Sequence, residues 1–119
     1  QDSKTCEELA NAIFQSAGDS NILIVGSSDL SHFHDYNQAV KKDSQFLENL
    51  GKMDVRGMLA DLKSGKCEAC GGGPAAVTVM TSKMMGASEA KILKYANSGD
   101  VTGDRARVVG YASAAFIKK

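Results

Sequence analysis

The chain has 119 residues, of which 43% are hydrophobic and 24% charged, and its 14 basic side chains balance its 14 acidic ones. This length suits a single domain with its own core, which we place at residues 1–119. A neutral chain without a basic run lacks the charge pattern that binds nucleic acid or an anionic membrane. No apolar stretch reaches the roughly 20 residues of a membrane-spanning helix.

The N-terminal part of the sequence predicts a helix followed by a strand. Residues 5–17 carry apolar side chains at helical spacing, and Thr5 with Glu8 fits a capping box. The run from Asn21 to Val25 is almost continuously apolar and rich in β-branched residues. That pattern predicts a central strand that is buried on both faces.

Three more helices are predicted in the middle of the chain. Two of them follow the candidate N-cap residues Asp35 and Asp54, and the third carries Pro74 in its first turn. Each apolar pattern stops at a glycine, namely Gly51, Gly65 and Gly86. The β-branched run at residues 77–79 leaves a strand open as the alternative for the third helix.

The C-terminal part predicts two strands, at residues 90–96 and 107–117, joined by a polar loop with two glycines. The resulting order is a helix, a strand, three helices and two strands. This order indicates an α/β fold class, with a mixed sheet flanked by helices.

Polar and titratable side chains follow the predicted central strand. Asp29 and His32 lie beyond its carboxyl end, where the sites of open α/β sheets gather. An aspartate three residues before a histidine can share its pocket and fix its tautomer, which suits acid–base chemistry near neutral pH. The alternative is a purely structural turn, because Ser27, Ser28 and Asp29 are all good capping residues. His34 is predicted to be an exposed loop residue.

The chain has three cysteines, Cys6, Cys67 and Cys70, and this odd number without a signal peptide indicates a reducing compartment, the cytoplasm. Cys67 and Cys70 form a CxxC motif, but no second ligand pair at zinc-site spacing accompanies it. Cys70 precedes three glycines and a predicted helix start, where free amides and the helix dipole favour a thiolate. The alternative for Cys70 is a small buried thiol.

Four ordered blocks, "ILIVGSSDLSH", "EACGGGPAA", "LKYANSGDVTGD" and "RVVGYASAAF", resemble the C-terminal half of the Memo-like family, called AmmeMemoRadiSam system protein B in prokaryotes. The resemblance runs from about Asn21 to Phe116. It implies a LigB-like fold, as in class III extradiol dioxygenases, which bind non-haem iron at the sheet edge. The motifs place Asp29, His32 and Cys70 on the family's pocket residues, with His32 and Cys70 as metal ligands and Ser28 at the rim.

The resemblance implies two classes of function. One is a metal-dependent oxidoreductase that uses iron or copper, with Asp29, His32 and Cys70 as catalytic residues. The other is a non-catalytic protein whose pocket binds a peptide or a small molecule. Family members carry two more pocket histidines in an N-terminal half. We therefore expect a C-terminal fragment that holds no metal by itself and pairs with that half or with a second copy of the chain.

Overall fold

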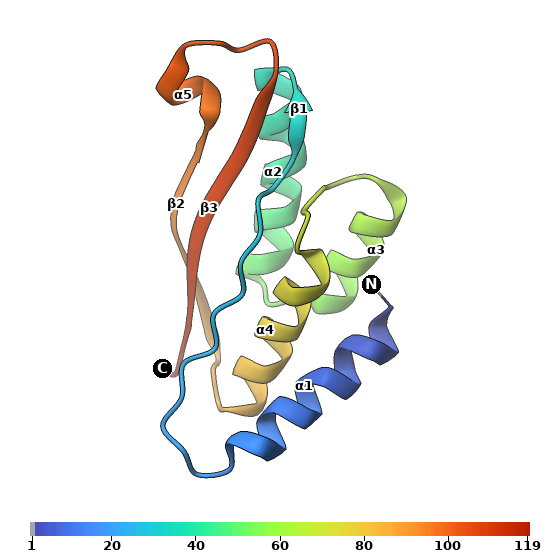
Figure 1. The fold of residues 1–119 in the computed structure, drawn as a ribbon, viewed down its shortest axis with the longest axis vertical. Helices are drawn as coiled ribbons and strands as arrows, with labels where there is room; N and C mark the ends of the chain where they lie inside the picture. The colour runs from blue at the N-terminus through green and yellow to red at the C-terminus, as the bar shows by residue number, and fades with distance from the viewer. Residues whose placement is uncertain (1) are drawn as a thin grey trace.

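The structure is a computed structural model that describes residues 2–119. Within that range the elements follow in the order α1 (Ser3–Ala17), β1 (His32–His34), α2 (Tyr36–Gly51), α3 (Val55–Ser64), α4 (Gly72–Met84), β2 (Glu89–Asn97), α5 (Ser98–Thr102) and β3 (Val108–Ile117). Figure 1 shows the long β2–β3 hairpin beside α2, with α1, α3 and α4 beyond it. No helix between residues 2 and 119 combines the length and the apolar character needed to cross a membrane.

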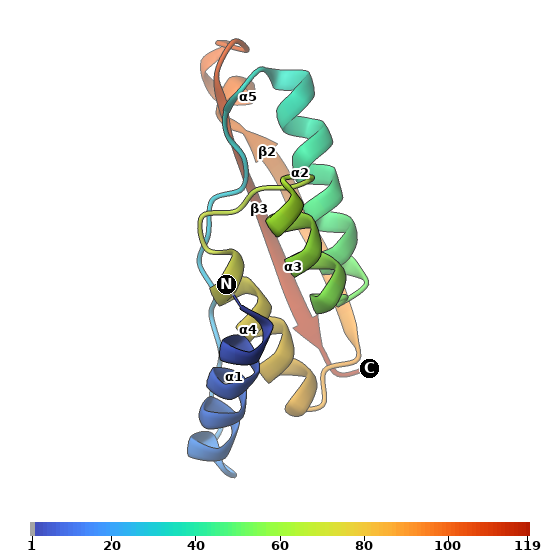
Figure 2. The same cartoon turned by 90° about the vertical axis from the view of Figure 1, so that its right-hand side faces the viewer.

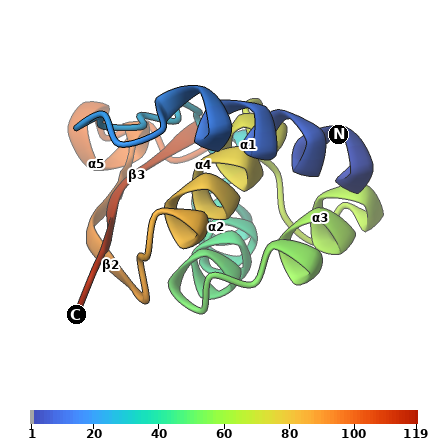
Figure 3. The same ribbon diagram turned by 90° about the horizontal axis from the view of Figure 1, so that it is seen from below.

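The strands form one sheet in the order β1-β3-β2, and both pairings are antiparallel. The β2–β3 ladder runs from Glu89 opposite Ile117 to Asn97 opposite Gly110, with one irregularity along it. Helices α2 and α4 pack on the same face of this hairpin, and α1 packs on α4 (Figures 2 and 3). The α/β fold class with helices on a sheet is confirmed.

The hydrophobic core lies between the helices and the covered face of the sheet. Met58 of α3, Val79 of α4 and Val108 of β3 have no exposed surface, and Phe46 of α2 is 3% exposed. These side chains come from four elements that are distant in sequence. The core therefore fixes the positions from which the connecting loops depart.

The predicted ends of α2 and α3 are largely confirmed. Asp35 accepts a hydrogen bond from the backbone N–H of Gln38, and Asp54 accepts one from that of Gly57. Both aspartates thereby satisfy a free amide in the first turn. Gly65 ends α3 with φ at 83°, a left-handed conformation that glycine adopts without strain.

Two local predictions are wrong, namely the start of α1 and the loop before β3. The N-cap of α1 is Asp2, which accepts from the amide of Lys4, so the helix starts before the predicted capping box at Thr5. The helix predicted around Pro74 is confirmed by α4, and the strand alternative for residues 77–79 is excluded, because tertiary packing overrides their β-branched side chains. The predicted loop before β3 contains the short helix α5, held by a capping box between Asn97 and Asp100.

The predicted central strand at Asn21–Val25 is also wrong. Figure 1 shows this segment running between α4 and β3 on its way from α1 to β1, outside the sheet. Leu23 and Val25 are 86% and 77% exposed. The chain joins β3 only further on, where Leu30 and Gly110 share a backbone hydrogen bond of 2.9 Å. An apolar run of this kind needs covering layers, and residues 2–119 supply no strand beside it. The predicted mixed sheet depended on this strand and is also wrong, because both pairings of the observed sheet are antiparallel.

A buried aspartate fixes the chain where it enters β1. Asp43 of α2 has no exposed surface and accepts hydrogen bonds from the Ser31 amide at 2.9 Å and the Tyr95 hydroxyl at 2.5 Å. Burial, together with this carboxylate, raises the pKa of Tyr95. A Cβ atom at Gly110 of β3 would overlap the Asp43 carboxylate. The sequence of α2 thus sets the position of the residue that precedes His32.

We expect Gly110→Ala to lower the free energy of unfolding by about 2 kcal/mol, because the added methyl group displaces the buried Asp43 carboxylate. Gly51→Ala is the matched control, since a Cβ atom there meets nothing within 4 Å. Its stability should be unchanged or higher by up to about 1 kcal/mol. Urea denaturation of both variants measures the difference, and equal effects would contradict the packing role of Gly110.

Candidate functional site

The structure brings Asp29, His32 and Cys70 together. One ligand atom from each, a carboxylate oxygen, an imidazole nitrogen and the thiol sulfur, lies within 4.8 Å of the others. The His32 Nε2 atom is 3.7 Å from Asp29 Oδ2. Asp29 lies on the approach to β1, His32 is the first residue of that strand, and Cys70 lies just before α4. Two loops distant in sequence therefore present three candidate ligands to one point.

Backbone contacts hold these two loops against each other. The Cys70 amide donates to the Asp29 carbonyl oxygen at 3.2 Å, and the Asp29 amide donates to Cys70 Sγ, also at 3.2 Å. The Ser28 hydroxyl accepts from the Gly71 amide at 2.8 Å and donates to the Asp29 carbonyl at 2.6 Å. We call this set of contacts between residues 28–29 and 70–71 the loop clasp. It places the Cys70 sulfur against Asp29.

The first glycine of the "GGG" run is required by the loop clasp. A Cβ atom at Gly71 would lie 2.5 Å from the Ser27 carbonyl oxygen and 2.9 Å from the Ser28 Cβ. Both neighbours belong to the opposing loop, so a side chain at this position would force the loops apart. The glycine therefore permits the close backbone approach that the site needs.

A second contact between the loops involves Glu68, which the sequence analysis did not single out. Its carboxylate lies 2.8 Å from His34 Nε2 and 3.6 Å from Lys42 Nζ. Partial burial alone would raise the pKa of Glu68, but the bond to His34 and the charge of Lys42 outweigh it and lower that pKa. His34 is half-buried on β1, so the prediction of an exposed loop residue is wrong. Nothing in the local sequence pairs residues 34 and 68, because only the fold brings them together.

The site is open to solvent. The side chains of Asp29 and His32 are 49% and 38% exposed, and Cys70 is exposed. His32 and Cys70 line a shallow cavity of about 290 Å³, whose apolar wall includes Leu30 and Leu62. A ligand can therefore reach all three candidate groups directly.

The other two cysteines behave differently from Cys70. Cys67 is 1% exposed, and burial raises the pKa of its thiol to about 11. Cys6 is 5% exposed and packs beneath α4, where its sulfur lies 3.9 Å from the Gly73 carbonyl oxygen. All three are free thiols. Cys67 stands outside the group of three candidate ligands, so the CxxC motif does not act as a pair here.

The geometry can now be set beside known proteins. The family described as "Memo-like protein" matches residues 1–115 of the chain. The chain belongs to the Memo-like family. A MEMO1 family protein of Methanopyrus kandleri is 41% identical over 97% of this chain and 41% of its own length. Similar proteins from Methanosarcina mazei and Nitrosopumilus maritimus are 37% and 35% identical. This Memo-like chain spans about two-fifths of the length of these curated relatives.

We expect an alkylating reagent at neutral pH to modify Cys70 before Cys6 and Cys67. Cys70 is exposed, whereas the other two sulfurs are buried, and Cys67 stays protonated because its pKa is raised to about 11. Mass spectrometry of a time course with iodoacetamide measures the order of labelling. Labelling of Cys6 first would contradict the structure.

Stability should fall as the pH rises from 9 toward 11. The folded protein holds the Cys67 proton more tightly than the unfolded chain, whose thiol keeps the ordinary pKa of 9.0. The associated stability is complete below pH 9 and is lost as the pH rises through the folded value, by up to about 3 kcal/mol. Urea denaturation across this range measures it. Cys67→Ala should show a shallower decline, and identical slopes would contradict the assignment.

Proposed function

We propose that Asp29, His32 and Cys70 supply part of a transition-metal site, and that the intact protein is a metal-dependent oxidoreductase related to LigB-type dioxygenases. The convergence of a carboxylate, an imidazole and a thiol within 4.8 Å supports this proposal. Nitrogen and sulfur ligands of this kind select iron, copper or zinc over magnesium or calcium. Solvent access leaves coordination positions for a substrate.

The donor set fits iron or copper incompletely. Non-haem iron sites commonly combine two histidines with a carboxylate, and blue-copper sites combine two histidines with a cysteine. The cluster contributes one histidine to either arrangement. The full family site, in this proposal, gains its remaining ligands from polypeptide outside this chain. We therefore propose that the 119-residue chain alone retains no stoichiometric iron or copper.

Each of the three residues has a role that follows from its contacts. Asp29 lies 3.7 Å from His32 and can orient the imidazole or accept its proton. The Asp29 amide donates a hydrogen bond to the Cys70 sulfur and holds it where a metal ligand is needed. A bound metal would supply Lewis-acid and redox chemistry at this point. Free thiols suit the reducing cytoplasm, where we place the protein.

Cobalt(II) titration of the 119-residue chain tests the ligand set. We expect a thiolate-to-cobalt charge-transfer band in the absorption spectrum. Cys70→Ser should abolish this band, and His32→Ala should weaken cobalt binding by about tenfold or more, because each removes one ligand. Metal analysis of the untreated chain should find less than one iron or copper per molecule.

The matched control is Cys67→Ala, which changes the neighbouring cysteine and should keep the band. Loss of the band in that variant would assign the sulfur ligand to Cys67. If cobalt binds without a thiolate band, or does not bind, the proposed metal-ligand set is wrong. The pocket would then belong to the alternative class, proteins that bind a peptide or small molecule without turnover.

A further inference from the structure

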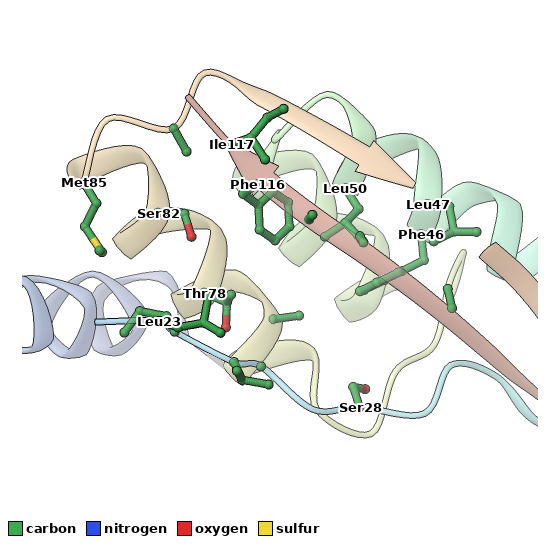
Figure 4. A pocket seen from close by; sticks show the side chains of 18 of the residues that line it. Leu23, Ser28, Phe46, Leu47, Leu50, Thr78, Ser82, Met85, Phe116 and Ile117 are labelled. Carbon is green, nitrogen blue, oxygen red and sulfur yellow. The ribbon is translucent and has the colours of Figure 1, made fainter. Parts of the chain in front are cut away.

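An apolar groove separates the segment after α1 from the sheet. Its cavity of about 580 Å³ lies between residues 22–28 on one side and β3 on the other, above α4 and α2. Figure 4 shows Phe116 of β3 facing this space, with Leu23 and Thr78 across from it and Ser28 at one end. Ser28 of the loop clasp lies at its end, but none of Asp29, His32 and Cys70 lines the groove, so it adjoins the metal site without sharing a candidate ligand.

The segment beside the groove has an unpaired backbone. Across residues 2–119, no hydrogen bond involves a backbone N–H or C=O group of residues 21–27. By contrast, the chain pairs with β3 just after this segment. There the Leu30 amide donates to the Gly110 carbonyl oxygen, and the Gly110 amide donates to the Ser31 carbonyl oxygen. A stretch of unpaired backbone next to a sheet is a template for another strand.

The side chains of this segment are also those of an unfinished strand. All four side chains of residues 22–25 line the groove, and their burial alternates: Ile22 and Ile24 are half-buried, whereas Leu23 and Val25 are 86% and 77% exposed. Residues 20–28 include no charged side chain. Alternating residues that are apolar on both faces are typical of a strand with neighbours, not of a solvated edge.

The relatives indicate where the missing neighbour comes from. About three-fifths of the Methanopyrus kandleri protein lies outside the part that matches this chain, and the other relatives leave a similar share. We propose that residues 21–27 are a docking edge for an extended, apolar polypeptide strand, and that this strand belongs to the unmatched three-fifths of the family's chain. Main-chain hydrogen bonds provide the affinity, and Leu23 and Val25 provide apolar contact. The inference does not depend on any metal.

Co-expression tests the docking edge. The partner is the part of the Methanopyrus kandleri protein outside its match, and the bait is the 119-residue chain. We expect a one-to-one complex in which amide exchange at residues 22–25 slows by at least about tenfold relative to the chain alone. Leu23→Asp should weaken the complex by at least about tenfold, because it places a charge in the apolar contact.

Val101→Asp is the matched control. Val101 is 87% exposed, as Leu23 is, but it lies on α5 and does not line the groove. The complex should survive this change, and circular dichroism should show both variants folded. Failure of the two pieces to co-purify, equal effects of the two variants, or a complex without protection at residues 22–25 would each overturn the proposal. Protection of these amides in a homodimer of the chain would overturn it in favour of a second copy.

Discussion

The loop clasp between residues 28–29 and 70–71 is the contact on which the rest of the site depends. Two backbone-mediated bonds join Asp29 and Cys70, and Ser28 and Gly71 close the set. Asp29 and Cys70 belong to the clasp, and His32 follows Asp29 by three residues. The clasp uses short side chains and backbone amides, so it fixes position with little loss of side-chain freedom. The site is therefore preorganised by main chain.

The residues around the loop clasp explain how a small, solvent-exposed site keeps its geometry. Asp43 is buried beneath the entry to β1 and holds the Ser31 amide, which precedes His32. Glu68 joins the cysteine loop to His34 and Lys42 on the other side. Rigid elements thus support the flanks of each ligand while the ligand atoms stay accessible. This division between buried support and exposed chemistry is common in functional sites.

The sequence predicted well those features that depend on local chemistry. The caps at Asp35 and Asp54 and the two C-terminal strands follow from side-chain bonds and periodicity, which act over a few residues. The strand prediction for residues 21–25 was wrong because a strand also needs neighbouring strands. The apolar pattern of a sequence does not say whether such neighbours are present. The juxtaposition of Asp29, His32 and Cys70 came from ordered family motifs. The Glu68–His34 pair had no such signal.

The span of the loop clasp also bears on when the site forms. Its Asp29–Cys70 contact joins positions 41 residues apart, and the intervening chain contains β1, α2 and α3. Closing so long a loop costs conformational entropy until the intervening helices pack and shorten it. We therefore expect the site to assemble late in folding, and the clasp to open locally while the core stays intact. Exchange of the Cys70 amide, which the clasp occupies, reports this opening separately from global unfolding.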